Sequence, residues 1–207
     1  QKGRDIESNI FRNFGMASPE GYRKALRLMR MAERFKLPIL TFIDTSGAYP
    51  GIEAEEKGQS EAIAKNLAEM FGIKVPIVAV VIGEGGSGGA LGIGVADSIL
   101  MLENSVYSVI SPEWCATILF NDSKKAPDAA RSLKIDSISL KSFGIIDGIV
   151  KEPLGGAHRD LKQASINLKT AVLKEFKKID KFEIENLLEK RYNKYRKIGE
   201  FFEKEGE

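Results

Sequence analysis

Apolar residues recur at helical spacing early in the chain and are followed by a short continuous apolar run. Ser18 and Pro19 suit the start of a helix. The apolar positions that follow repeat with a helical period up to about residue 35: Tyr22, Ala25, Leu28, Met29, Ala32 and Phe35. The run at 38–44, "PILTFID", then predicts a strand that ends in the turn "TSGAYPG".

The same order of elements occurs a second time. Residues 58–73 predict another amphipathic helix, and "VPIVAVVIG" at 75–83 predicts a strand that is covered on both faces, because its apolar residues do not alternate with polar ones. The turn "GEGGSGGA" follows, and then a short helix of small residues. Further strands are expected at 98–104, 106–111 and 145–150, with short helices broken at Pro112, Pro127 and Gly144. Strands alternating with helices predict an α/β fold with a largely parallel sheet.

The composition changes after "PLGGAHRD". Residues 160–205 are rich in Lys, Glu and Leu and contain no proline. Apolar residues are scattered along this segment: Ile166, Leu168, Leu173, Phe176, Ile179, Phe182, Leu187, Leu188 and Tyr192. We expect a core at 1–157 and a C-terminal helical arm at 158–207. The arm either docks a partner, which would make the protein oligomeric, or packs on its own domain.

The charge balance and the rare residues exclude several classes of protein. The 207 residues include 31 Lys and Arg against 29 Asp and Glu, and a net charge of +2 makes nucleic acid an unlikely main partner. The single cysteine, Cys115, and the single histidine, His158, leave no disulfide framework and too few ligands for a structural zinc site. With no apolar stretch of membrane-spanning length, we expect a cytoplasmic protein. The start at Gln1 suggests that an N-terminal segment is missing.

The glycine-rich turn at 80–95, "VVIGEGGSGGALGIGV", fits three kinds of chemistry. Gly83, Gly85 and Gly88 match the dinucleotide fingerprint, and Glu103 lies where that fold has the acidic residue that binds the ribose of the cofactor. The following helix is short for that fold, however. Gly85, Ser87 and Gly89 match the nucleophile elbow of hydrolases, for which His158 is the available imidazole base.

The third interpretation uses the backbone alone. Both "DTSGAYPG" and "GEGGSGGA" place small residues between a strand and a helix, so that N–H groups converge there with no side chains in the way. Such a pair of turns suits the stabilisation of an oxyanion. Glycines present only for tight packing of helix on sheet are the alternative.

Five long strings resemble one family. They are "RNFGMASPEGYRKALRLMRMAERFKLPILTFIDTSGAYPG", "EEKGQSEAIAKNLAEM", "VIGEGGSGGALGIGVAD", "YSVISPEWCA" and "EPLGGAHRD". Together they are similar to the carboxyltransferase α subunit of bacterial acetyl-CoA carboxylase, from about Gly3 to Asp180. The resemblance implies a crotonase-like fold of repeated ββα units, with an N-terminal hairpin that would precede Gln1.

The resemblance also implies an activity and its participants. The carboxyl group of carboxybiotin, held on a separate biotin carboxyl carrier protein, would pass to acetyl-CoA to give malonyl-CoA in an α2β2 assembly whose β subunit carries zinc. The backbone N–H groups of Gly88 and Gly89 would bind the ureido oxygen of biotin. The turn residues Gly85, Gly86, Gly47 and Ala48 would line the substrate site. Another biotin-dependent acyl-CoA carboxylase subunit, a serine hydrolase using Ser87, and a scaffold without catalysis are the other candidates.

Three further features of the sequence bear on the site. Ser46 replaces the proline usual in the family, which frees one more N–H and loosens the first turn. Acidic residues lie near both turns, and none of them is assigned as a general base: Asp44, Glu53, Glu55, Glu56 and Glu84. Four arginines form a basic stripe at helical spacing, either a solvated face or a contact for an anion such as a phosphate of CoA: Arg23, Arg27, Arg30 and Arg34.

Overall fold

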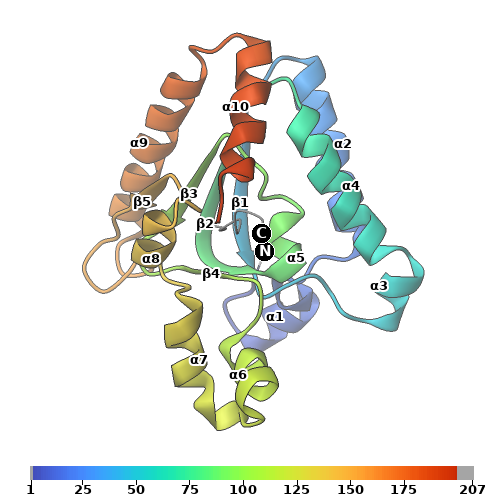
Figure 1. Cartoon of the computed structure of the whole chain (residues 1–207), viewed down its shortest axis with the longest axis vertical. Coiled ribbons are helices and arrows are strands. Elements are labelled where there is room, and N and C mark those ends of the chain that lie inside the picture. The colour runs from blue at the N-terminus through green and yellow to red at the C-terminus, as the bar shows by residue number, and fades with distance from the viewer. Residues whose placement is uncertain (1, 200–207) are drawn as a thin grey trace, which may run out of the picture.

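The computed structural model describes residues 2–199 and shows a parallel sheet between two layers of helices (Figure 1). The strands are β1 (Ile39–Thr45), β2 (Ile77–Gly86), β3 (Ser98–Leu102), β4 (Val106–Ser108) and β5 (Gly148–Val150). Four of them follow the order β1-β2-β3-β5, and β4 pairs with the far end of β2. Every one of these pairings is parallel, which confirms the predicted fold class.

One face of the sheet is covered by helices from the first half of the chain. These helices are α2 (Pro19–Arg34), α4 (Gln59–Gly72) and α5 (Ser87–Leu91). The odd-numbered residues of β2, Ile77 to Val81, pack in one cluster with Met29 of α2 and Met70 of α4. The even-numbered Val78 and Val80 face the other way, so β2 is buried on both faces, as its lack of alternation predicted.

The C-terminal helices are α9 (Leu161–Ile179), which covers the other face, and α10 (Ile184–Arg196), which packs partly on each face, because Leu187 lies in the cluster of Val78 whereas Tyr195 packs against the cluster of Val81. Val78 and Val80 share a cluster there with Val172 of α9 and Leu187 of α10. The segment expected to be helical from residue 160 forms these two helices in its described part, and they pack on their own sheet. Residues 200–205 of that expected segment lie outside the described part. Phe176, offered as an anchor for a partner, packs in this cluster, whereas Tyr192 is exposed.

The remaining helices are short. At the N-terminal end lies α1 (Ile6–Phe11), which begins with a capping box between Asp5 and Ser8. The segment after β1 contains α3 (Ile52–Glu56), and α6 (Pro112–Phe120), α7 (Ala126–Leu133) and α8 (Ser137–Ser142) follow β4. In Figure 1, α6 and α7 project from the end of the molecule opposite the loop between α9 and α10. The helices α6 to α8 fall where short helices broken at Pro112, Pro127 and Gly144 were predicted, while α1 and α3 were not predicted.

Candidate functional site

The two glycine-bearing turns lie side by side because the strands that lead into them are neighbours. β1 and β2 pair in parallel, so both turns leave the sheet at its carboxyl edge. The register brings Thr45 opposite Gly85, after an irregularity between Ile43 and Thr45. Residues 40 positions apart in the chain therefore form one surface.

The contact between the turns is made by backbone on backbone. A Cβ atom built on Gly86 would lie 2.0 Å from the carbonyl oxygen of Ser46. One built on Gly89 would lie 2.3 Å from the carbonyl carbon of Gly47 and 2.4 Å from the amide nitrogen of Ala48. Any other residue at 86 or 89 would push the turns apart, so these two glycines are required by the close approach.

The first turn is closed by a side chain instead of by proline. Thr45 Oγ1 donates to the carbonyl oxygen of Gly47 at 2.6 Å and accepts the Gly47 N–H at 3.2 Å. The Gly47 N–H is therefore used inside the turn, whereas open space surrounds the position of a Gly47 Cβ. Ser46 leaves the turn ordered because Thr45 supplies the hydrogen bonds that hold it.

The second turn presents the first residues of α5 without a cap. No side chain of residues 2–199 caps this helix, and the N–H groups of its first turn have no intrahelical acceptor. Ser87 turns the chain from β2 into α5 with a φ of 51°, a left-handed conformation that costs a non-glycine residue roughly 1 to 2 kcal/mol. Gly88 is partly exposed and a Cβ there would meet only Ile63, at 3.8 Å, whereas Gly89 is buried. Backbone atoms at Gly88 are thus open to a ligand.

Two buried side chains hold α5 from the helical layer. Tyr22 Oη on α2 donates to the carbonyl oxygen of Gly89 at 3.1 Å. Asn66 Nδ2 on α4 donates to the carbonyl oxygens of Gly92, at 2.9 Å, and of Tyr22, at 3.1 Å. Burial raises the pKa of Tyr22 to about 12, so its hydroxyl keeps its proton at neutral pH and remains a donor. The position of α5 therefore depends on both helices.

Tyr22→Phe removes the hydroxyl that donates to Gly89 and leaves that carbonyl without its buried donor. We expect the free energy of unfolding to fall by about 1 to 3 kcal/mol, because an orphaned buried acceptor costs its desolvation. Denaturant unfolding followed by circular dichroism measures this. Tyr192→Phe is the matched control, since Tyr192 is exposed and should lose almost nothing. Equal stability of the Tyr22→Phe variant and the parent would show that the hydrogen bond does not position α5.

An ion-pair cluster lies where the two turns begin. Lys2 Nζ is 2.7 Å from Glu84 Oε2 and 3.3 Å from Asp44 Oδ1, and the Glu84 N–H donates to Asp44 Oδ1 at 3.1 Å. Burial lowers the pKa of Lys2, but its hydrogen bond to Glu84 and the charge of Asp44 outweigh this and raise the pKa overall. The two carboxylates nearest the turns are therefore bound to a cation. Those on α3, at Glu53, Glu55 and Glu56, are exposed.

The structure does not bring the proposed hydrolase pair together. Ser87 lines an apolar cavity of about 350 Å³ together with Leu91, Tyr107 and Tyr195. His158 lines a different cavity, with Gly83 and Asn104. Within residues 2–199 no hydrogen bond joins the two side chains. Nothing in this geometry activates Ser87 as a nucleophile.

The structure does not fit the dinucleotide interpretation either. α5 spans only five residues, whereas that fold needs a long helix behind the glycine turn. The carboxylate of Glu103 is held by Lys151 Nζ at 2.7 Å and accepts the Glu152 N–H at 3.3 Å. These hydrogen bonds, that to Lys151 above all, lower the pKa of Glu103. Glu103 therefore serves as an anchor for the segment after β5.

Two features are absent from the part of the chain that the structure describes. Between residues 2 and 199, no three side chains of His, Cys, Asp or Glu form a group that could hold a metal ion. In the same range, no helix combines the length and the apolar character needed to cross a membrane.

Sequence reasoning identified both glycine turns, which the structure brings side by side, but it did not find the residues that support them. Tyr22 was identified only as an apolar position of α2, and Asn66 and Lys2 were not singled out. Asn66 did carry a signal, since it is a polar residue on the buried face of an amphipathic helix, where only a hydrogen-bonded side chain is stable.

Comparisons with known proteins agree on one family. The model of the family described as acetyl co-enzyme A carboxylase carboxyltransferase-like matches residues 1–199. The acetyl-coenzyme A carboxylase carboxyl transferase subunit alpha of Fusobacterium nucleatum is 64% identical over 201 residues, which cover 97% of this chain and 64% of the relative. The Vibrio cholerae subunit of the same name is 59% identical over 199 residues, covering 96% of this chain and 62% of the relative. The chain thus spans less than two thirds of the length of these relatives.

Solved structures of low identity share the fold. A Pseudomonas malonate decarboxylase hetero-tetramer in complex with coenzyme A aligns with a TM-score of 0.67 and 17% identity, covering 86% of this chain and 72% of that one. A transcarboxylase 12S structure aligns with a TM-score of 0.62 and 20% identity, covering 75% of this chain and 31% of that one. With the family model matched over almost the whole sequence and relatives this similar, the chain belongs to the acetyl co-enzyme A carboxylase carboxyltransferase-like family.

Proposed function

We propose that this chain works as the α subunit of a carboxyltransferase that moves a carboxyl group from carboxybiotin to acetyl-CoA and so forms malonyl-CoA. The names of relatives up to 64% identical to the chain support this activity. Biotin would arrive on a separate carrier protein. A zinc-bearing β subunit would complete an α2β2 assembly. These soluble substrates suit the cytoplasmic location expected from the sequence.

The observation that carries the proposal is the pair of glycine turns packed backbone on backbone. Gly86 and Gly89 allow that contact, and Gly88 and Gly47 leave backbone atoms uncovered by any side chain beside it. A ligand can therefore reach the uncapped start of α5 directly. This arrangement suits a polar, flat group such as a ureido ring, which binds through its oxygen.

The chain's own contribution would be hydrogen-bond donors for a developing anion. Negative charge collects on the ureido oxygen when the bond between its ring nitrogen and the carboxyl group breaks. The N–H groups of Gly88 and Gly89 would donate to that oxygen, with Gly85 and Gly86 shaping the turn and Gly47 and Ala48 forming the opposite wall. Loss of one such donor in other enzymes lowers the rate by about 10² to 10³.

No side chain of this chain is assigned as a general base, and the departing biotin anion would itself take the proton from the acetyl group. Asp44 and Glu84 are bound to Lys2, and the acidic residues of α3 are exposed. The donors for the acetyl-CoA enolate would come from the β subunit. Each subunit would then stabilise one of the two anions of the reaction.

Reconstitution tests this division of labour. The chain is extended to the full length of its relatives and mixed with a carboxyltransferase β subunit, carboxylated carrier protein and acetyl-CoA. The malonyl-CoA formed is measured by mass spectrometry. We expect product only when both subunits are present, because one subunit alone lacks half of the donors. Robust malonyl-CoA formation by the α chain alone would contradict the proposal, and so would an inactive mixture in which both subunits are folded and bound to each other.

A further inference from the structure

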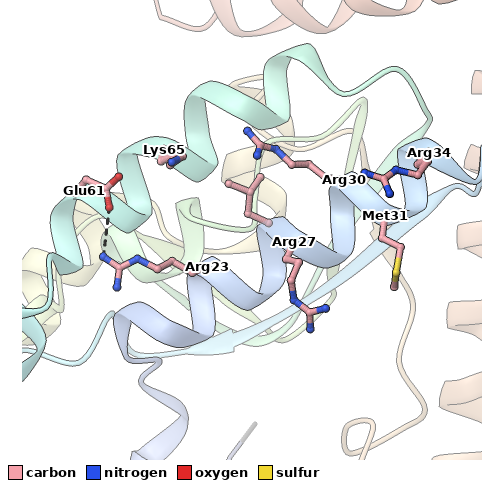
Figure 2. A pocket seen from close by; sticks show the side chains of 8 residues that line it. Arg23, Arg27, Arg30, Met31, Arg34, Glu61 and Lys65 are labelled. Carbon is pink, nitrogen blue, oxygen red and sulfur yellow. Dashed lines mark hydrogen bonds and ion pairs between the residues drawn. The ribbon is translucent and has the colours of Figure 1, made fainter.

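A basic groove runs between α2 and α4 on the outer side of the helical layer (Figure 2). It has a volume of about 440 Å³. Its polar lining consists of the four arginines of the stripe, Lys65 and Glu61, and its apolar lining of Leu26 and Met31. The stripe predicted from the sequence is therefore one wall of a concave site, and α4 supplies the other wall.

The groove holds more positive charge than its own acidic residues neutralise. Arg23 pairs with Glu61 at 3.4 Å, and Arg30 pairs with Glu69. Three cations of the lining, Arg27, Arg34 and Lys65, make no ion pair with any described residue. The whole chain has a net charge of only +2, so this excess is a local feature.

The paired and unpaired cations of the groove differ in where their side chains point. Arg23 and Arg30 extend across the groove toward α4 and bind carboxylates there, whereas Arg27 turns away from α4 toward solvent (Figure 2). Arg34 and Lys65 come from opposite walls. A ligand in the groove would thus meet a guanidinium from α2 and an ammonium from α4.

The chemistry of the lining selects the ligand class. Guanidinium groups bind phosphate oxygens in pairs of parallel hydrogen bonds, and ammonium groups bind phosphate as point charges. The volume lies within the range of small-molecule sites, roughly 300 to 1,000 Å³. Leu26 and Met31 offer apolar contact beside these cations, which suits a ligand that carries both phosphates and an aromatic base.

We propose that the groove binds the phosphate groups of a nucleotide-containing ligand. Two sources share this chemistry: the nucleotide end of a coenzyme A molecule, and a free nucleotide. The proposal does not depend on the proposed function, because the groove lies outside the glycine turns. The two regions are nonetheless connected, since Arg23 follows Tyr22, which holds Gly89. Along the axis of α2, Arg34 lies about 16 Å from Arg23, which is at the end of the helix near Gly89.

Titration calorimetry of the full chain at low ionic strength tests the proposal, with coenzyme A, dephospho-coenzyme A and ATP as separate probes. We expect binding that weakens as salt is added. The Arg34→Gln, Lys65→Gln double variant should raise the Kd of the bound probe about tenfold or more, because two charge-assisted contacts are lost. This variant breaks no ion pair between described residues, and its melting temperature should match that of the parent.

The control is the Lys162→Gln, Lys169→Gln double variant on α9, which removes the same charge from the other side of the sheet. It should change the Kd less than twofold. Preference for coenzyme A over its dephospho form would identify the coenzyme as the ligand, and equal or tighter binding of ATP would identify a free nucleotide. Failure of all three probes to bind the parent, or an equal loss of affinity in both double variants, would overturn the proposal.

Discussion

Gly88→Pro should lower the rate of carboxyl transfer by the reconstituted enzyme about 10²-fold or more, because proline removes an N–H proposed to donate to the substrate oxyanion. Gly88 is the better test position of the two proposed donors. It is partly exposed and has room for added atoms, whereas Gly89 touches the backbone of Gly47. Proline is also tolerated in the first turn of a helix. Steady-state formation of malonyl-CoA with saturating substrates measures the effect.

Gly88→Ala is the matched control for this substitution. It adds a Cβ that meets only Ile63 at 3.8 Å and keeps the N–H, so turnover should stay within a few-fold of the parent. Gly89→Ala should instead disturb the contact between the turns, because its Cβ would lie 2.3 Å from Gly47. A Gly88→Pro enzyme that is folded, bound to its β subunit and fully active would remove this N–H from the mechanism.

Ser87→Ala separates the backbone mechanism from the hydrolase interpretation in the same assay. The backbone mechanism consumes no hydroxyl, so most of the carboxyl transfer should remain. A nucleophilic Ser87 would require the activity to be lost. Both outcomes are read against the parent at equal concentrations of folded enzyme.

Arg191→Met should destabilise the protein by about 3 to 5 kcal/mol, because it leaves a buried carboxylate without its partner. The side chain of Arg191 is fully buried and that of Asp97 is 6% exposed. The guanidinium donates to both carboxylate oxygens of Asp97 at 2.8 Å, and also to the carbonyl oxygens of Met70, Ile73 and Val75. One side chain of α10 thus ties the end of α4 and the start of β2 together.

Thermal and denaturant unfolding measure this loss, which for a chain of this size corresponds to a fall in Tm of about 10 °C. Arg196→Met on the same helix is the control, since Arg196 is exposed and should change stability by no more than about 0.5 kcal/mol. Adding Asp97→Asn to Arg191→Met should cost less than the two single changes summed, because it removes the unpaired charge. An Arg191→Met protein as stable as the parent would mean that α10 is held by its apolar contacts alone.

The local pattern of the sequence determined the longer elements and the two glycine turns. Helical spacing after Pro19 predicted α2 to within a residue of its end, and the unbroken apolar run at 75–83 predicted a strand buried on both faces, because each depends only on neighbouring residues. The two turns were likewise predictable, since small residues followed two strands that a parallel fold places at one edge. The division into a core and an arm at residue 158 stays a prediction.

Contacts between distant residues were decided only by the tertiary structure. The sequence does not indicate that Tyr22 holds Gly89, that Lys2 joins Asp44 to Glu84, or that Arg191 is buried on Asp97. In the sequence, Arg191 looks like any charged residue on a polar helix. Its burial could not be predicted, because burial of a charge depends on which acceptors the fold brings around it. The basic stripe shows the same limit: its spacing was visible in α2, but the opposite wall with Lys65 and Glu61 comes from α4, and only packing of the two helices makes a groove.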